Sequence, residues 1–346
     1  MTYRLITKEI WCLINILYFL LYSSQKEFFK IMGLTGEEAS RLIKQASDNL
    51  SLVIKGKSEK IELVILALVA GGHILIEDIP GVGKTTLAKA LAKTIDGTFN
   101  RIQFTPDLLP TDITGINIFK QTDNSFSFHP GPIFAHIVLA DEINRASPRT
   151  QSALLEAMSE EHVTVDGTCH PLPSAFIVLA TQNPIEYHGT YPLPEAQLDR
   201  FMLQIDMGYL PQNEEQNLLI NRTREEPVDK ISPVLSLSSL AQLKNSVDTI
   251  LIEKSISQYM LEIVQATRRH PQLRLGVSTR GTLLYGRIVR ARAMLHQRDY
   301  VIPEDVKSLA IPVLAHRVLL DTKSQYAGSS RLEIISQIIS TIKTPK

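Results

Sequence analysis

A glycine-rich turn between an apolar run and an amphipathic stretch restricts what this chain can fold into more than any other feature. The turn is Asp78–Thr85; it follows His73–Glu77 and precedes Thr86–Ala92. The run before the turn is typical of a buried strand, and the apolar spacing after it is typical of a helix. A strand, a glycine-rich turn and a helix in this order form a loop that binds phosphate groups. The sequence therefore predicts a nucleotide at the tip of a strand.

The turn contains the groups that a polyphosphate requires. Gly81 and Gly83 allow the backbone to curl so that its N–H groups point inward, and the following helix adds its positive end. Lys84 can reach the β- and γ-phosphates, and Thr85 can ligate Mg²⁺. The expected nucleotide-binding residues in the turn are Asp78, Pro80, Gly81, Val82, Gly83, Lys84, Thr85 and Thr86.

One position departs from the usual pattern, which begins with glycine where this chain has Asp78. Without glycine, the first turn cannot rely on an unrestricted φ angle, although aspartate tolerates left-handed backbone better than most residues. The alternative is a glycine-rich turn that holds no ligand. The adjacent Lys84-Thr85 pair argues against that alternative.

Length and composition are those of a globular protein with room for two domains. The chain has 346 residues, of which 44% are hydrophobic and 21% are charged. Its 36 basic and 36 acidic residues balance, so the net charge gives no indication of nucleic acid or a membrane surface as a partner. Cys12 and Cys169 form no Cys-x-x-Cys pair, which fits a reducing compartment, and the expected location is the cytoplasm. The histidines have no metal-ligand spacing, so Mg²⁺ is the metal ion that we expect.

Residues 1–31 are the unusual part of the chain. Ile10–Tyr22 is strongly apolar, yet it is shorter than the ~20 residues that a membrane-spanning helix needs. Ser23–Lys30 is charged and aromatic and offers no signal-peptide cleavage site. Met32–Glu38 resembles a natural start, because it contains a threonine and a glutamate with the spacing of a capping box. Three interpretations stay open for residues 1–31: a mis-assigned upstream extension, a helix that touches a membrane, or a packed helix.

Four further short apolar runs are candidates for strands. They are Arg101–Phe104, Ile137–Ala140, Ala175–Ala180 and Met202–Ile205. Together with His73–Glu77 they predict a parallel five-stranded sheet with helices on both faces. Two helices over 37–68 precede this sheet, and we assign residues 32–210 to the α/β domain. Residues 211–346 have the pattern of amphipathic helices punctuated by prolines, and we expect a second, all-α domain there.

Two β-hairpins interrupt the α/β order. Their strands are Ile116–Lys120 with Ser125–Phe128, and Val163–Val165 with Thr168–His170. Insertions of this kind lie on the surface, where loops carry function. Exposed Phe126 and Phe128 can grip a polypeptide, whereas aromatic hairpin faces more often pack on their own domain.

The run Ile137–Ala140 ends in two carboxylates, Asp141 and Glu142. Side chains that are neighbours in a strand point apart, so Asp141 can face a Mg²⁺ ion while Glu142 reaches an attacking water. Two solvated acids at the end of a strand are the alternative. With a phosphate-binding loop upstream, the pair favours nucleotide hydrolysis over transfer to a small molecule.

Four motifs of this chain are specific enough to suggest a family. They are Asp141–Ala146, Pro148–Met158, Ala180–Pro184 and Leu193–Phe201. Together they resemble the MoxR branch of the AAA+ ATPases. The resemblance runs from about Val53 to the C-terminus and is strongest across 73–210. It implies a P-loop NTPase domain with β-hairpin inserts, followed by an α-helical lid domain, and ATP and Mg²⁺ as cofactors.

The resemblance also implies roles for individual residues. Lys84 and Thr85 match the Walker A motif, Asp141 and Glu142 match the Walker B pair, and Asn183 matches the first sensor. Asp141 would bind nucleotide and, with Thr85, the metal. Because Asn183 follows an apolar run, its amide is also expected at a strand tip, where it can orient the water.

Two arginines resemble groups that neutralise negative charge in the transition state of hydrolysis. Arg200 matches an arginine finger supplied by a neighbouring subunit, although an arginine at a helix end can also satisfy the last carbonyls. Arg280 matches the second sensor, which reaches from the lid to the γ-phosphate. The family more often has Ser-Pro-Arg-Ala where this chain has Thr279 and Gly281, and Gly281 is expected to weaken the start of the helix. Arg145 and Arg149 are further candidates for contact with a neighbour's nucleotide.

The leading hypothesis is a Mg²⁺-dependent ATPase that couples hydrolysis to remodelling or maturation of a client protein. The resemblance implies a homo-oligomer, with a hexameric ring as the expected form, and a partner with a von Willebrand factor A domain. An AAA+ nucleic-acid motor is one alternative, but Lys120 is the sole basic residue across 112–128 and 162–170 has none. An ATP-gated scaffold with negligible turnover is another. Membrane contact is expected only if residues 1–31 are translated.

Overall fold

A five-stranded parallel sheet forms the centre of the structure, a computed structural model that describes residues 34–345 except 123, 185–189 and 222–225. The strands are β1 (His73–Glu77), β2 (Phe99–Gln103), β5 (Ile137–Asp141), β8 (Ile177–Gln182) and β9 (Phe201–Ile205). Their order is β2-β5-β8-β1-β9, and every neighbouring pair is parallel. The predicted α/β fold is confirmed. Residues 1–31, with their three interpretations, lie outside the described residues.

The register of the sheet aligns the carboxyl ends of four strands. Glu77 pairs with Gln182, and Gln103 pairs with Asp141. The loops that leave these strands therefore start at one edge of the sheet, where open parallel sheets bind their ligands. We call this side, which carries Asp78–Thr85, the carboxyl edge, and the opposite side, where His73 begins β1, the amino edge.

Helices cover both faces of the sheet because successive strand residues point to opposite faces. On one face, Leu75 and Val138 belong to a buried cluster with Leu154 of α6 (Pro148–Glu160). On the other face, α3 (Ser58–Ala70) packs on β1 and β9, and α4 (Lys84–Thr94) packs on β2 and β5. As expected, α2 (Gly36–Val53) precedes α3. The shorter elements are α5 (Pro110–Thr114), η1 (Ile143–Arg145), α7 (Glu195–Leu198), α8 (Gln212–Asn221) and η2 (Pro227–Lys230).

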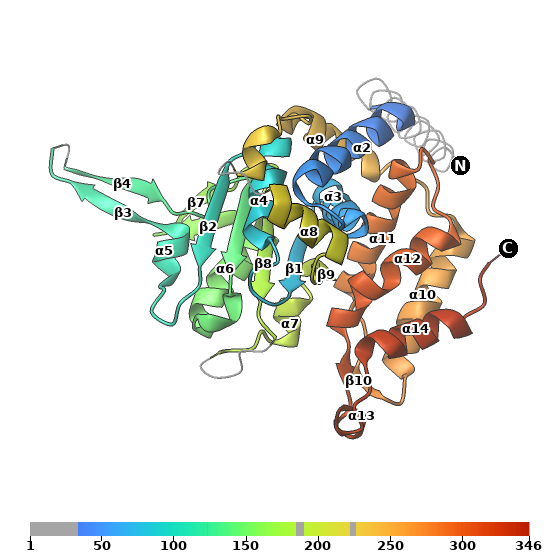
Figure 1. Ribbon diagram of the computed structural model, residues 1–346. Coiled ribbons are helices and arrows are strands. Elements are labelled where there is room, and N and C mark those ends of the chain that lie inside the picture. The colour runs from blue at the N-terminus through green and yellow to red at the C-terminus, as the bar shows by residue number, and fades with distance from the viewer. Residues whose placement is uncertain (1–33, 123, 185–189, 222–225, 346) are drawn as a thin grey trace, which may run out of the picture. The chain divides into compact units, whose positions relative to one another are not determined.

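The C-terminal part of the chain is largely helical (Figure 1). It comprises α9 (Leu237–Val247), α10 (Lys254–Arg269), α11 (Thr279–Leu295), α12 (Pro303–Leu314), η3 (Ala315–Arg317), α13 (Thr322–Tyr326) and α14 (Arg331–Thr341). Helix α11 contacts α2 and α3, and α12 contacts β9, so this region packs directly on the sheet and its N-terminal helices. Across the described ranges, no helix combines the length and apolar character needed to cross a membrane.

A short antiparallel ribbon within the helical region was not expected from the sequence. It joins β10 (Leu273–Leu275) to β11 (Leu319–Leu320). The expectation that strands stop after residue 210 is wrong here, because segments this short contain too few residues to show an alternating pattern.

Both predicted hairpins are present. Strand β3 (Gly115–Lys120) pairs with β4 (Ser125–Pro130), and β6 (His162–Val165) pairs with β7 (Thr168–Pro171). The β3–β4 hairpin projects away from the sheet (Figure 1).

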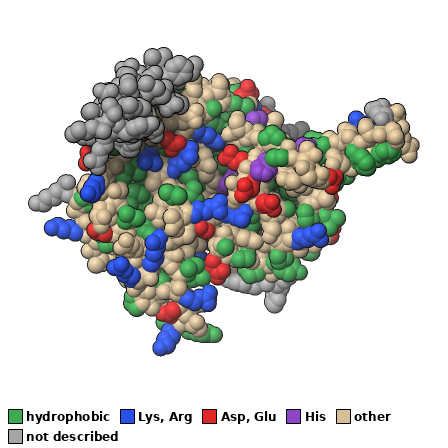
Figure 2. Space-filling model, turned by 180° about the vertical axis from the view of Figure 1, so that it is seen from behind, with side chains coloured by type: hydrophobic (Ala, Val, Ile, Leu, Met, Phe, Trp, Pro, Cys, Tyr) green, Lys and Arg blue, Asp and Glu red, His purple; other side chains and the backbone are tan. Residues whose placement is uncertain are grey.

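The two aromatic residues of β4 have different surroundings. Phe128 stacks on His170 of the second hairpin with ring centroids 3.8 Å apart, so this side chain packs on its own domain. Phe126 is 70% exposed and contacts Phe119 across the hairpin, with ring centroids 5.3 Å apart. Hydrophobic side chains are visible on the outer part of the projecting hairpin (Figure 2). Phe128 therefore packs on its own domain, whereas Phe126 stays exposed on the projecting hairpin.

Candidate nucleotide-binding site

The carboxyl edge contains a cavity of about 380 Å³ that unites the loop after β1 with the ends of β5 and β8. It is lined by Pro80, Gly81, Gly83, Lys84, Thr85, Thr86, Arg101, Asp141, Glu142 and Asn183. The structure therefore brings together five residues that the sequence singled out for chemistry: Lys84, Thr85, Asp141, Glu142 and Asn183.

The loop has the curled backbone that its glycines allow. Gly81 and Gly83 have φ angles of 87° and 91°, and a Cβ atom at either position would meet no neighbouring atom. These glycines are thus required for their left-handed backbone rather than for space. Lys84 begins α4, and its Nζ donates hydrogen bonds to the carbonyl oxygens of Asp78 at 3.0 Å and Ile79 at 3.3 Å. The ammonium group is therefore held at the mouth of the loop.

Asp78 has a structural role that differs from the expected one. Its φ angle is not positive, so the left-handed tolerance of aspartate is not used here. Instead, its Oδ2 accepts hydrogen bonds from the backbone N–H groups of Met207 at 2.5 Å and Gly208 at 2.7 Å. Its Oδ1 accepts from the N–H of Ile79 at 2.8 Å, and the residue is buried. The carboxylate thus ties the start of the phosphate loop to the segment after β9.

A buried lysine supports the same segment from the other side. Lys57 donates to the carbonyl oxygens of Met207 at 2.7 Å and Gly208 at 2.5 Å. Burial lowers the pKa of the Lys57 ammonium, and the charge of Asp78 partly opposes that shift. Asp78 therefore satisfies the two N–H groups of this short segment, and Lys57 satisfies its two carbonyl oxygens. This contact could not be predicted from the sequence, because it joins three distant segments that meet only after folding.

Asp141 accepts hydrogen bonds from two side chains that the sequence did not single out. Thr181 donates from Oγ1 to Asp141 Oδ1 at 2.6 Å, and Arg101 donates from Nη2 to Asp141 Oδ2 at 2.6 Å. Thr181 is fully buried, so it fixes one carboxylate oxygen. Arg101 is half-exposed and faces the cavity. Within the part of the chain that the structure describes, no group of three His, Cys, Asp or Glu side chains could hold a metal ion.

Glu142 lies beside the cavity in a left-handed backbone conformation with a φ angle of 57°. Its N–H donates to Thr181 Oγ1 at 2.8 Å. Its Oε2 accepts from Gln103 Nε2 at 2.7 Å and from Arg145 Nη1 at 2.9 Å. Arg145, one of the two further candidates for contact with a neighbour's nucleotide, therefore contacts a carboxylate of its own chain. Arg149 is exposed in the first turn of α6.

A second cavity, also of about 380 Å³, lies on the other side of the phosphate loop. It is lined by Val53, Ile54, Lys55, Lys57, Pro80, Gly81, Val82, Gly83, Thr86, Gly208, Tyr209, Leu210, Glu215 and Pro227. Apolar side chains from the end of α2 and from the segment after β9 form two of its walls. The predicted residues Val82 and Thr86 line this cavity, and its position next to the loop suits a planar base.

Arg200 and Arg280 lie together at the amino edge. Arg200 directly precedes β9, whose first residue pairs with His73, and its Nη1 donates to the carbonyl oxygen of Leu155 in α6. Arg280 donates from Nη2 to Ser159 Oγ at 3.0 Å on the same helix. Burial lowers the pKa of Arg200, and the nearby charge of Arg280 lowers it further.

This position separates the two arginines from the phosphate loop of their own chain. The length of β1 lies between them and Lys84, which is on the order of 15 Å at the usual rise per strand residue. The expectation that Arg280 reaches the γ-phosphate of its own subunit does not agree with this geometry. The reason is that the start of α11 packs against α6 and Asp199 rather than over the loop.

Gly281 is explained by packing rather than by helix propensity. A Cβ atom at this position would lie 2.7 Å from Cδ and 2.8 Å from Nε of Arg317. The helix starts normally at Thr279 despite the glycine, because Ser278 Oγ accepts the N–H of Gly281 at 2.9 Å. The expected weakening of the helix start is therefore offset by a cap, and the glycine makes room for an arginine.

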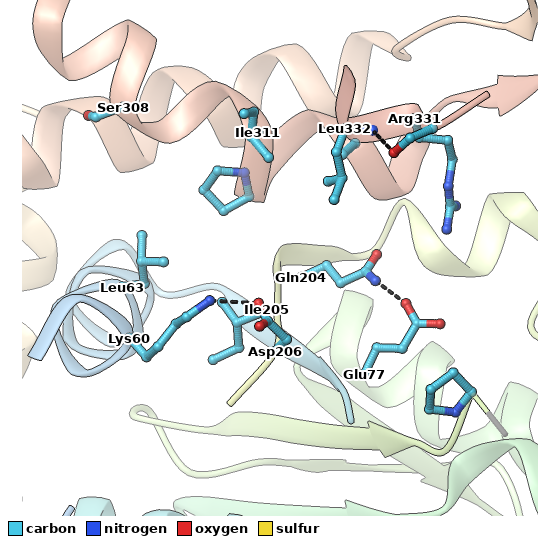
Figure 3. A pocket seen from close by; sticks show the side chains of 14 residues that line it. Lys60, Leu63, Glu77, Gln204, Ile205, Asp206, Ser308, Ile311, Arg331 and Leu332 are labelled. Atoms are coloured by element: carbon cyan, nitrogen blue, oxygen red, sulfur yellow. Dashed lines mark hydrogen bonds and ion pairs between the residues drawn. The ribbon is translucent and has the colours of Figure 1, made fainter. Parts of the chain in front are cut away.

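A third cavity, of about 590 Å³, lies between the ends of β1 and β9 and the helices α12 and α14 (Figure 3). Lys60 and Asp206 form an ion pair of 2.6 Å on its wall, and Gln204 donates to Glu77. Arg331 points into the same space (Figure 3). Opposite charges on this wall are already in contact with one another, so the cavity has no uniform charge that would select a ligand.

Two family profiles match this chain. One, described as the ATPase family associated with various cellular activities (AAA), covers residues 73–203, and the other, described as an AAA lid domain, covers residues 265–338.

Individual proteins are similar over most of their length. The YeaC protein of Bacillus subtilis is 48% identical over 309 residues, which are 89% of this chain and 97% of that protein. Chaperone MoxR1 of Mycobacterium tuberculosis is 39% identical over 313 residues, covering 88% of this chain and 82% of that protein. A crystal structure from Cytophaga hutchinsonii, provisionally assigned as an ATPase, superposes with a TM-score of 0.84 and 37% identity over 94% of this chain and 99% of that one.

The identity, the coverage of both domains and the shared fold agree with the constellation at the carboxyl edge. The chain belongs to the MoxR-type AAA+ ATPases, a family of nucleotide-binding enzymes that hydrolyse ATP.

Proposed function

We propose that this ATPase uses Mg²⁺ and couples ATP hydrolysis to the remodelling or maturation of a client protein. The observation that carries the proposal is the cavity in which Lys84, Thr85, Asp141, Glu142 and Asn183 face one another. A cation, a hydroxyl, two carboxylates and an amide around one space are the groups that phosphoryl transfer to water requires.

ATP would occupy both cavities that flank the loop. Its phosphates would lie against the backbone N–H groups of Gly81 to Thr85 and the ammonium of Lys84, at the N-terminus of α4. Its base would enter the second cavity between Ile54 and Leu210, where apolar walls favour a planar ring. Lys84 would exchange its two carbonyl contacts for phosphate oxygens.

The residues present fit a Mg²⁺ ion. Thr85 and Asp141 both line the cavity and offer the oxygen ligands that Mg²⁺ prefers, with the remaining ligands coming from phosphates and water. When bound, the ion would neutralise charge on the phosphates. Asp141 must then exchange its contact with Arg101 for the metal, while Thr181 keeps the other carboxylate oxygen fixed.

Glu142 is proposed as the base that removes a proton from the attacking water. The water oxygen forms a bond to the γ-phosphorus as the bond to the β–γ bridging oxygen breaks, and the proton passes to the Glu142 carboxylate. Asn183 would orient that water from the neighbouring strand tip. Glu142 must first leave Gln103 or Arg145, so both contacts hold the site in a resting arrangement.

Arg200 and Arg280 are proposed to act on the nucleotide of a neighbouring subunit. They lie beside each other at the amino edge and cannot reach the loop of their own chain, whereas a neighbour's loop could meet them in a head-to-tail assembly. The complete site would then require two subunits. A ring, with six subunits as the expected form, supplies one such interface per subunit.

Client contact is proposed for the projecting β3–β4 hairpin. Phe126 and Phe119 expose an aromatic pair there, and Ile116 and Ile118 are also exposed. A protein with a von Willebrand factor A domain is the partner class that we propose. The hairpin has few basic side chains for nucleic acid, since Lys120 is the only one across 112–128.

Phosphate release measured with purified protein tests the hydrolytic part of the proposal. We expect release that depends on ATP and Mg²⁺ and falls by roughly 10²- to 10⁴-fold in E142Q, while E142Q still binds ATP. Turnover that survives E142Q would remove Glu142 as the base, and a wild-type protein without turnover would favour the ATP-gated scaffold. The client can then be sought by pull-down with E142Q, which retains ATP and holds partners longer.

A further inference from the structure

A buried arginine of the helical region contacts the segment that carries Arg200. Arg317 ends η3, and its side chain is only 1% exposed. Its Nε donates to Asp199 Oδ1 at 3.0 Å, and its guanidinium also donates to the carbonyl oxygens of Phe201 and Met202. A charged group this deeply buried is stable only where its donors are satisfied. The pocket around Arg317 is therefore built for a guanidinium.

Asp199 connects this arginine to both arginines of the amino edge. It directly precedes Arg200 in the chain. Its second carboxylate oxygen, Oδ2, accepts a hydrogen bond from Ser278 Oγ at 2.8 Å. Ser278 caps the helix α11, whose second residue is Arg280. One carboxylate thus joins the segments that carry Arg200 and Arg280, and Arg317 holds that carboxylate.

Helix α6 determines where the two arginines point. Arg200 contacts the carbonyl oxygen of Leu155, and Arg280 contacts Ser159 one turn later. The two positive charges are close enough for the charge of Arg280 to lower the pKa of Arg200, while two glutamates of α6 partly offset this effect. A pair of guanidinium groups held at one edge is suited to a phosphate chain, which has oxygens for both.

Gly281 shows that the chain accommodates Arg317 at this place. The position lies one residue after Arg280, and a Cβ atom there would come within 2.7 Å of Arg317 Cδ. A side chain at 281 would push either α11 or Arg317 away. The absence of a side chain therefore lets Arg317 pass directly beneath the turn that presents Arg280.

We propose that Arg317 is a positioning residue for ATP hydrolysis in the neighbouring subunit. Through Asp199 and Ser278 it fixes Arg200 and Arg280 as one phosphate-facing pair. The inference rests on the proposed function, because it requires that the pair completes a neighbour's site. Arg317 itself does not touch the nucleotide.

The first experiment compares R317K and G281A with the wild-type protein. Lysine keeps the charge but cannot donate to Asp199 and several carbonyl oxygens at once. Alanine at 281 leaves every polar group in place and displaces Arg317. We expect both variants to bind ATP with nearly unchanged affinity, because their own loop is intact, and to lose roughly 10²-fold in kcat, as for a small misplacement of a reacting group.

The matched control is R298K. Arg298 donates to both carboxylate oxygens of the buried Asp305 in the same helical region, at 2.7 and 2.8 Å, but it is itself partly exposed and does not contact Asp199. R298K should lower the melting temperature without a selective loss of kcat. An equal loss of kcat in R298K and R317K would overturn the proposal, because any weakening of the helical region would then suffice.

The decisive experiment mixes subunits. R317K subunits keep an intact loop and Glu142, whereas E142Q subunits keep an intact arginine pair. In an equal mixture that assembles at random, about one site in four combines the loop of an R317K subunit with the arginines of an E142Q subunit. We expect the mixture to hydrolyse ATP faster than the sum of its components. The double variant E142Q/R317K should give no rescue when it is mixed with R317K.

The outcomes separate this inference from the function on which it rests. A mixture of R317K and E142Q that is no more active than its two components would overturn the positioning role, because the defect would then lie in the variant's own site. A wild-type protein that hydrolyses no ATP, or an R200A variant with full turnover, would instead contradict the proposed function.

Discussion

Asp78 stands where a phosphate loop usually has glycine, and the structure shows what the side chain contributes. Its carboxylate accepts three backbone N–H groups, two of which belong to the Met207–Gly208 turn. That turn borders the cavity proposed for the base, while Lys84 bonds to the carbonyl oxygen of Asp78. The residue therefore links the phosphate side of the site to the base side.

Restoring the usual glycine should thus harm this protein. D78G leaves the N–H groups of Met207 and Gly208 without their acceptor, and we expect the free energy of unfolding to fall by about 1–3 kcal/mol. ATP binding should weaken as well, because the Met207–Gly208 segment, which borders the base cavity, is no longer held in place. Urea denaturation and calorimetric titration measure the two effects. D206N is the control, since Asp206 is largely exposed in its ion pair with Lys60, and its effect should stay within about 0.5 kcal/mol. A D78G protein as stable as wild type would contradict this role.

Arg101 competes for the carboxylate proposed to ligate Mg²⁺. Its guanidinium lies 2.6 Å from Asp141 Oδ2 and is half-exposed. Removing this charge in R101M should lower the Mg²⁺ concentration needed for half-maximal ATP binding by about two- to fivefold, as for a partly exposed ion pair worth up to about 1 kcal/mol. A titration of nucleotide binding against Mg²⁺ measures the shift. A higher Mg²⁺ requirement in R101M would show that Arg101 assists the metal site instead.

At the scale of single elements, the amino end of β1 depends on a neutral histidine. His73 is buried, accepts the N–H of Val178 on Nδ1 and bonds the carbonyl oxygen of Met158 through Nε2. Burial lowers the pKa of His73 from 6.5 to about 4. The folded state therefore binds this proton less readily than the unfolded chain does.

The sign of the pH effect follows from that shift. The stabilising contribution of His73 is complete above pH 6.5 and is lost as the pH falls toward 4. Between pH 7 and pH 5, the free energy of unfolding should drop by about 2 kcal/mol from this residue alone. H73N, which keeps an acceptor near Nδ1, should show a smaller drop in urea denaturation at the two pH values. An equal drop in both proteins would contradict the assignment.

The β4 strand offers a matched pair of aromatic substitutions. F128S removes a ring that stacks on His170 and contacts Phe134, so it should lower the melting temperature by several degrees. F126S changes an exposed side chain and should leave the melting temperature nearly unchanged. In the E142Q background, F126S should reduce the amount of protein that is retained in a pull-down. Undiminished retention would remove the hairpin as the client contact.

The sequence predicts the elements of this fold better than the contacts between them. The apolar runs identify all five parallel strands, and the loop, Asp141-Glu142 and Asn183 each follow one of them. Thr181, Arg101 and Gln103 were missed because their roles depend on the register that sets β2 beside β5 and β8. Arg317 was missed for a related reason, since its partner Asp199 lies more than a hundred residues earlier in the chain.

At the scale of the whole molecule, the arrangement of the site implies that one subunit holds an incomplete set of groups. The loop and the acidic pair lie at the carboxyl edge, and Arg200 and Arg280 lie at the amino edge beside α6. The helical region packs on the N-terminal helices α2 and α3 through α11, and its Arg317 holds Asp199 next to Arg200. A subunit that binds ATP at one edge and offers arginines at the other is suited to head-to-tail assembly.

Phosphate release by mixtures of R200A and E142Q tests this arrangement most directly. R200A has the loop and the base without the finger, and E142Q has the finger without the base, so each protein alone should be nearly inactive. If the site is shared between subunits, the mixture should hydrolyse ATP well above the sum of the two, with a maximum near equal proportions. A mixture no more active than its two components, with R200A alone as active as wild type, would contradict the account.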